Sequence, residues 1–147
     1  MSLGFSNSTP SIIFEPKEIR YVKDITINGH CFTDGCARIS LAAMKEIGEN
    51  LGCCGTPSAL QGRIGGAEGV WYIDPRKDFS ENKWIELRES QIKYKHHLDD
   101  DFVHLRTLEI LHVAGSSATP GTLNSQFIRV LYNGGVSINV FLKKMKD

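Results

Sequence analysis

The apolar and polar positions along the chain fall into short runs, several of them spaced as in β-strands. Residues 19–27 alternate roughly, and they predict one or two short strands before a turn at Asn28 and Gly29. Residues 84–88 have the composition of a strand. Residues 105–113, rich in leucine and β-branched side chains, predict a strand that is buried on one face.

Helical spacing appears in three other segments. Ser40 suits an N-cap, and apolar residues then recur at intervals of three or four up to Gly52, which suits the position after a helix. Two more helices are expected near the end of the chain, one ending at residues 133–135 and one capped by Ser137. The small residues of segment 115–121 predict a linker before them.

The stretch from Ser58 to Pro75 joins two apolar runs through a glycine pair, Gly65 and Gly66. Glycine adopts positive φ and allows close backbone approach, so this pattern predicts a strand, a tight turn and a second strand. The turn lacks the Lys-Ser/Thr ending of a phosphate-binding P-loop. A phosphate or a polymer could still lie against it, with Arg63 pointing out of the first strand.

Together these elements indicate an α+β fold that is mainly β, a small barrel with an inserted helix. Residues 1–10 are predicted to be a disordered leader and residues 11–115 the barrel. Residues 116–147 are predicted to be a helical connector that is truncated, because its last helix has an unmatched apolar stripe. A length of 147 residues is enough for one domain with a sizeable core.

Charge and cysteine content narrow the function. The 17 basic and 17 acidic side chains cancel, which argues against a stand-alone nucleic-acid binder. No apolar run approaches the ~20 residues of a membrane helix, and the N-terminus has no signal-peptide pattern. The four cysteines have neither zinc-site nor disulfide spacing, so we expect free thiols and an intracellular location, in the nucleus or cytoplasm.

Two groups of charged residues are candidates for a site. The carboxylates of residues 99–101 could hold a hard cation, but consecutive side chains diverge, so a solvated loop is favoured. Arg63, Arg88 and Lys93 could form a phosphate-facing strip, since Arg and Lys are the usual phosphate partners. Each alone is more often a surface cation, and the charges between residues 61 and 95 nearly cancel.

Seven segments share a common resemblance when they are taken in order: residues 32–40, 57–63, 65–69, 74–75, 87–94, 108–110 and 123–128. The first two read Phe-Thr-Asp-Gly-Cys-Ala-Arg-Ile-Ser and Pro-Ser-Ala-Leu-Gln-Gly-Arg. Together the seven resemble the cellular RNA-dependent RNA polymerases of eukaryotic RNA silencing, with a fungal member favoured. The resemblance implies a double-psi β-barrel, the first of two in the polymerase core.

The same resemblance implies which of the two barrels carries the catalytic metal site. The family's catalytic Mg²⁺ site is an Asp-x-Asp-Gly-Asp motif on the second barrel, and this chain has no such motif. The resemblance therefore implies that this chain has no catalytic residue, metal site or cofactor. It implies that the full-length parent uses Mg²⁺. The partners implied are the second barrel, an RNA template and nucleoside triphosphates, with no membrane.

The resemblance also assigns contacts. Gln61 and Arg63 match the family's Gln-x-Arg motif, and Lys93 matches the lysine after its Ser-x motif. These three are implied to bind nucleotide and RNA, with Lys93 on phosphate. Arg88 is a further candidate. Glu68 stands where the family usually has lysine, and an acid there would repel phosphate.

Two other positions depart from the family pattern. Gly62 replaces a bulky apolar residue, and Glu89 replaces a proline.

The sequence as a whole leads to two hypotheses of function. The chain is the first-barrel fragment of a polymerase, inactive alone, or it is a non-catalytic double-psi β-barrel module that binds RNA or protein. Glu68 and the zero net charge favour the second.

Overall fold

The computed structural model is a mixed α+β fold, rich in sheet, with three α-helices in the part that it describes. The described residues are 7–74, 81–94, 102–114 and 124–144. The chain divides into two compact units, Met1–Ser116 and Ser117–Asp147. The first unit holds the strands and one helix, and the second holds the other two helices.

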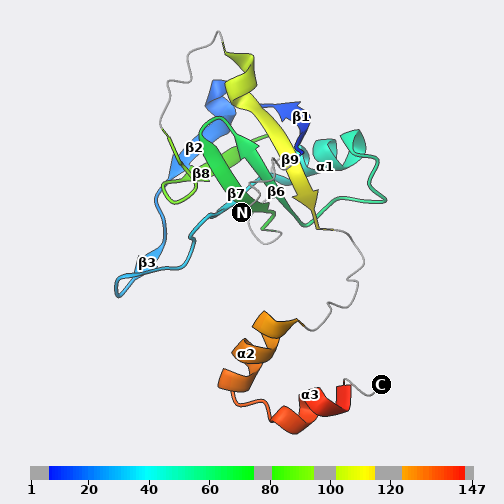
Figure 1. Ribbon diagram of the computed structural model, residues 1–147. Helices are drawn as coiled ribbons and strands as arrows, with labels where there is room; N and C mark the ends of the chain where they lie inside the picture. Colours follow the sequence, from blue (N-terminus) through cyan, green and yellow to red (C-terminus); the bar gives the residue numbers. More distant parts are fainter. Residues whose placement is uncertain (1–6, 75–80, 95–101, 115–123, 145–147) are drawn as a thin grey trace. The chain divides into compact units, whose positions relative to one another are not determined.

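A five-stranded sheet forms the centre of the first unit (Figure 1). In spatial order its strands are β1 (Thr9–Ile13), β9 (Thr107–Val113), β6 (Ala59–Ile64), β7 (Ala67–Tyr72) and β5 (Cys36–Arg38). Neighbouring strands are antiparallel, except that β5 and β7 are parallel. The predicted strand, glycine turn and strand are therefore confirmed as the hairpin of β6 and β7.

Two smaller sheets complete the unit. Strands β2 (Ile19–Val22) and β8 (Ile85–Arg88) pair in parallel, and β3 (Thr26–Ile27) forms a hairpin with β4 (His30–Cys31). The predicted turn is confirmed in that hairpin, because Asn28 and Gly29 have positive φ angles of 51° and 78°. The hairpin points away from the five-stranded sheet (Figure 1).

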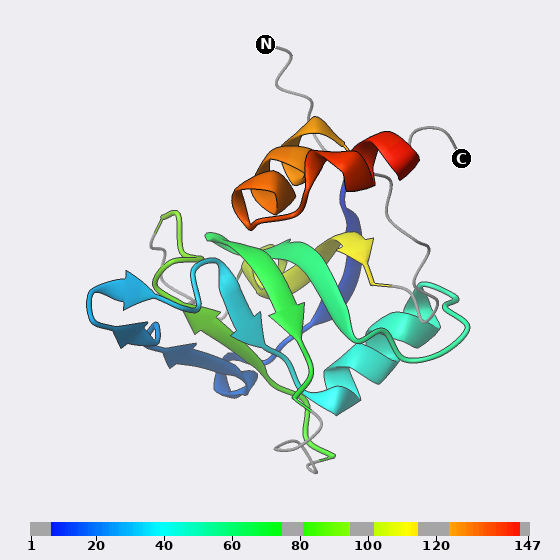
Figure 2. The same cartoon turned by 90° about the horizontal axis from the view of Figure 1, so that it is seen from below.

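Helix α1 (Leu41–Asn50) begins and ends as its sequence predicts. Ser40 Oγ accepts a hydrogen bond from Ala43 N at 3.1 Å. At the other end, Gly52 N donates to Glu49 O and Cys53 N donates to Gly48 O, which are the two bonds of a Schellman motif. The motif requires a left-handed residue, and Gly52 has a φ of 66°. Figure 2 shows α1 in cyan beside the green strands.

Replacing Ser40 by alanine is expected to lower the free energy of unfolding by about 2 kcal/mol, from the lost cap and a stranded buried amide. The amide is that of Trp84, which donates to Ser40 Oγ at 3.0 Å. Urea denaturation would measure the loss. The exposed Ser58 is a matched control, and Ser58→Ala should change stability by less than about 0.5 kcal/mol. Equal effects of the two changes would contradict the prediction.

The core lies between the five-stranded sheet, α1 and β8. Its largest fully buried apolar side chains are Trp71, Phe14, Ile39, Met44, Ile47, Leu60, Ile64, Ile85 and Leu108. On β9, Leu108 and Ile110 are buried, so the expected burial of one face is confirmed. That strand begins at Thr107 rather than at residue 105, because Val103–Arg106 forms a 3-10 helix.

The first strand begins earlier than its sequence suggests. Strand β1 takes in Thr9 and Pro10, which were assigned to the leader, because it pairs along β9. Just before it, Ser8 Oγ donates to Glu109 Oε2 at 2.6 Å. The structure thus places the last two residues of the predicted leader, Thr9 and Pro10, in strand β1.

The second unit contains α2 (Ser125–Asn133) and α3 (Ile138–Lys144), so both predicted helices are confirmed. Asn124 caps α2, with Oδ1 accepting from Gln126 N and Phe127 N at 2.9 Å. The expected linker at 115–121 and the carboxylates of 99–101 lie outside the described residues.

Candidate functional site

Strand β6 presents two of the predicted contact residues on one face. Side chains of a strand alternate, and Leu60, Gly62 and Ile64 face the core. Gln61 and Arg63 therefore share the opposite face, with Gln61 exposed and Arg63 half-buried. The departure at Gly62 has a steric reason in this chain, because a Cβ there would lie 2.5 Å from the Glu109 carbonyl oxygen.

Arg63 lies between two acidic positions on the neighbouring strands. Glu68 of β7 and Glu109 of β9 are its direct cross-strand partners. Such partners have Cβ atoms about 5 Å apart, so both carboxylates are within reach of the guanidinium. The face that carries Gln61 and Arg63 is thus polar and of mixed charge.

Lys93 lies beside the glycine turn between β6 and β7. Lys93 N donates to Gly66 O at 2.8 Å, and Glu68 N donates to Gln91 O at 3.0 Å. A side chain at Gly66 would not fit, because its Cβ would lie 2.1 Å from the Tyr94 carbonyl oxygen. The segment from Ser90 to Tyr94 turns back on the hairpin, and its backbone pairs with Gly66 and Glu68.

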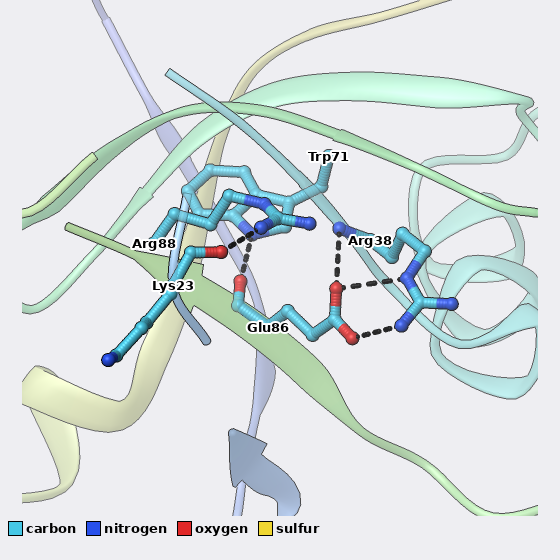
Figure 3. A network of polar contacts seen from close by, with 5 residues as sticks. All are labelled: Lys23, Arg38, Trp71, Glu86 and Arg88. Carbon is cyan, nitrogen blue, oxygen red and sulfur yellow. Dashed lines mark hydrogen bonds and ion pairs between the residues drawn. The ribbon is translucent and has the colours of Figure 1, made fainter. Parts of the chain in front are cut away.

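Lys93 and Arg88 have different surroundings. The Lys93 side chain is exposed, and Nζ donates to Ser90 O at 3.4 Å. Arg88 is only 6% exposed, and its guanidinium donates to Lys23 O (Figure 3). Backbone pairing therefore places Lys93, Glu68 and Arg63 near the turn end of the β6–β7 hairpin, while the Arg88 side chain is buried.

An ion pair between a buried Glu86 and a half-buried Arg38, not foreseen from the sequence, joins β5 to β8. Arg38 Nε and Nη2 donate to the Glu86 carboxylate at 3.0 and 2.5 Å, and Trp71 Nε1 donates to Glu86 O at 2.7 Å (Figure 3). The Glu86 side chain is only 3% exposed. Its hydrogen bond raises the pKa of Arg38 above the usual value. Nothing in the local sequence links residues 48 positions apart.

A second unforeseen cluster gathers on Asp24. Its carboxylate accepts hydrogen bonds from Thr33 and from the side chain and amide of Ser90. Burial alone would raise the pKa of Asp24, but these bonds and the charge of Arg88 lower it below the ordinary value. The carboxylate is therefore held ionised at neutral pH.

Within 7–74, 81–94, 102–114 and 124–144, no three His, Cys, Asp or Glu side chains are grouped so that they could hold a metal ion. The same residues include no helix that is long and apolar enough to span a membrane. The polar groups on the outward face of the central strand β6, and in the turn beside it, are cations, amides and carboxylates, which can bind and orient a charged ligand.

Comparison with solved structures points to one class of protein. The fold is similar to the "RNA dependent RNA polymerase QDE-1 from Thielavia terrestris", with a TM-score of 0.76 and 39% identity. The match covers 89% of this chain and 14% of that one. The shared fold is therefore that of a part of an RNA polymerase.

Sequence comparisons agree. The chain is 34% identical over 148 residues to the rice protein described as "Probable RNA-dependent RNA polymerase 1", covering 98% of this chain and 18% of that protein. It is 33% identical over 129 residues to RNA-dependent RNA polymerase 1 of Schizosaccharomyces pombe, covering 86% of this chain and 10% of the relative. A family model described as "RNA dependent RNA polymerase" matches residues 1–147. The chain belongs to the RNA-dependent RNA polymerase family, and it spans a small part of each relative's length.

Proposed function

We propose that this chain is the first double-psi β-barrel region of an RNA-directed RNA polymerase that acts in RNA silencing. The parent, a fungal intracellular protein, adds ribonucleotides to RNA on an RNA template. The observation that carries the proposal is the family match over residues 1–147, together with the small share of each relative that the chain spans.

In this proposal the chain binds and orients the nucleotide and the RNA, and it contains no residue that makes or breaks a bond. Gln61 and Arg63 contact nucleotide or RNA from the outer face of β6, and Lys93 contacts phosphate beside the glycine turn. Two observations support this. Gln61 and Lys93 are exposed, and the glycine turn that follows the strand of Gln61 accepts a hydrogen bond from Lys93 N. Fixed cations stabilise the charge that develops on a transferring phosphoryl group.

Metal chemistry belongs to another part of the parent in this proposal. The Mg²⁺ implied by the family would polarise the phosphate and activate the attacking hydroxyl. The described residues of this chain contain no cluster that suits it. A second barrel with three clustered aspartates, encoded in the same reading frame, is the expected partner.

A template-directed extension assay tests the proposal. The full-length polymerase should incorporate labelled ribonucleotides on an RNA template in the presence of Mg²⁺, and the 147-residue chain alone should incorporate none. Incorporation by the chain alone would overturn the fragment assignment. A parent reading frame without a second barrel would overturn the polymerase assignment.

One observation favours the alternative, a non-catalytic double-psi β-barrel module that binds RNA or protein. Arg63 has carboxylates directly opposite it on both sides, from Glu68 and Glu109. Acids at these positions compete with phosphate for the guanidinium. If the module is correct, the full-length protein binds RNA or a protein partner but extends no template.

Replacing Glu68 by lysine is expected to tighten RNA binding by the parent roughly thirtyfold at low salt, since the charge changes by two units and each unit near a phosphate contributes about 1 kcal/mol in water. The new lysine would lie beside Lys93 and opposite Arg63. Fluorescence anisotropy with a labelled RNA, repeated at high salt, would measure the gain and its screening. Glu49→Lys on the exposed side of α1 is the charge-matched control, and an equal gain there would contradict the prediction.

A further inference from the structure

The carboxylate of Asp24, in the loop after β2, joins three separate segments. Its Oδ1 accepts from Thr33 Oγ1 and Ser90 Oγ, both at 2.8 Å, and its Oδ2 accepts from Ser90 N at 2.9 Å. Thr33 lies just before β5, and Ser90 lies just after β8. One side chain therefore connects two loops, one nine residues further along the chain and the other 66 residues further.

The two hydroxyls transmit backbone hydrogen bonds to this carboxylate. Ser90 Oγ accepts from Gly35 N at 3.0 Å, and Thr33 Oγ1 accepts from Ile25 N at 2.9 Å. Each hydroxyl thus accepts from an amide and donates to Asp24, although Ser90 Oγ also has Thr33 O within 3.3 Å. Chains of this kind polarise one another, so the charge on Asp24 strengthens every link.

The same cluster holds the start of the turn that carries Lys93. Ser90 opens the turn that carries Lys93, and Lys93 Nζ donates to the carbonyl of Ser90 at 3.4 Å. The far end of the turn is fixed by the bond from Lys93 N to Gly66 O at 2.8 Å. Asp24 therefore holds the residue whose carbonyl orients the ammonium group.

We propose that Asp24 is a positioning residue, which acts through Ser90 to orient the Lys93 ammonium toward a phosphate of the nucleotide or RNA. This inference rests on the proposed function of Lys93. Asp24 itself touches no ligand in this arrangement. Its contribution should therefore disappear when the Lys93 ammonium is removed.

The turn has a separate anchor, so loss of Asp24 should leave the fold in place. Gln91 is fully buried, its Oε1 accepts from Arg88 N at 3.0 Å, and its Nε2 donates to Val70 O at 3.5 Å. These bonds hold the turn against β7 without the carboxylate. Asp24→Asn removes the charge and one acceptor while keeping the size of the side chain.

The test is a double-mutant cycle in the full-length polymerase, with wild type, Asp24→Asn, Lys93→Ala and the double variant. The kcat and KM for a nucleoside triphosphate are measured on an RNA template. We expect Asp24→Asn to lower kcat/KM about tenfold, and to change it less than twofold in the Lys93→Ala background, because the two residues act as one unit. Glu49→Gln, which removes an exposed carboxylate from α1, should leave kcat/KM unchanged.

The possible outcomes separate this inference from the proposed function. If Lys93→Ala lowers kcat/KM but Asp24→Asn does not, or if the two effects multiply, the positioning role is wrong and the function of Lys93 stands. If Lys93→Ala has no effect, the proposed function of Lys93 fails and the inference fails with it. Ser90→Ala is the second variant should Asp24→Asn not fold, and it should show the same dependence on Lys93.

Discussion

Replacing Arg38 by methionine is expected to lower the free energy of unfolding by about 3 kcal/mol, because the change leaves a buried carboxylate without its ion partner. The Glu86 side chain is only 3% exposed, and Arg38 supplies two charged hydrogen bonds to it. Methionine keeps much of the length and apolar surface of arginine, so the loss reports on the charge. Urea denaturation, followed through the fluorescence of the two buried tryptophans, Trp71 and Trp84, would measure it.

A double variant separates the stranded charge from lost packing. Arg38→Met with Glu86→Leu removes both charges, and most of the lost stability should return, because paired apolar residues replace a buried ion pair at little cost. Lys45→Met on the exposed side of α1 is the matched control and should cost less than about 0.5 kcal/mol. Additive losses in the double variant would show that the Arg38–Glu86 pair is not the cause.

The elements that the sequence predicted well are those set by local signals. Ser40 and Gly52 mark the ends of α1 with side-chain and backbone chemistry that acts within a few residues. The glycine pair after β6 requires a turn, because Gly65 has a φ of 52° and Gly66 has no room for a side chain. Such features leave a readable pattern in any single sequence.

The sequence contains no comparable local signal for which strands pair with each other. β2 pairs with β8 and β5 pairs with β7, both in parallel, across long stretches of chain. Register between distant strands depends on how whole faces pack together, and one-dimensional periodicity does not specify it. The sheet order therefore had to come from the structure, and so did strands β1 and β5, which no sequence pattern predicted.

In the candidate site, too, some features follow from local sequence and others depend on contacts between distant segments. Gln61 and Arg63 are two residues apart on one strand, so their common face follows from strand periodicity. That Lys93 lies beside Glu68 depends on the bonds from the Ser90 turn to Gly66 and Glu68, which the sequence left open. Asp24 had no signal at all, because its partner Ser90 is 66 positions away.

Replacing Lys93 by alanine is expected to lower kcat/KM of the full-length polymerase for nucleoside triphosphates about a hundredfold, as loss of one preorganised donor to a developing charge does. The backbone bond from Lys93 N to Gly66 O is kept in alanine, and the side chain makes only a long, exposed bond to Ser90 O. The fold should therefore be preserved, with a free energy of unfolding within about 0.5 kcal/mol of wild type. Steady-state kinetics and urea denaturation of the same preparations would measure both quantities.

The charge and the shape of Lys93 can be separated by a conservative change. Lys93→Arg keeps a cation that can reach phosphate, so it should retain more activity than Lys93→Ala. Lys45→Ala removes another exposed cation, from α1, and should leave the kinetics unchanged. A large loss of stability in Lys93→Ala would instead mark the residue as structural. If the kinetics of Lys93→Ala match those of Lys45→Ala, the phosphate contact is wrong, and the acidic surroundings of Arg63 would then favour the non-catalytic module.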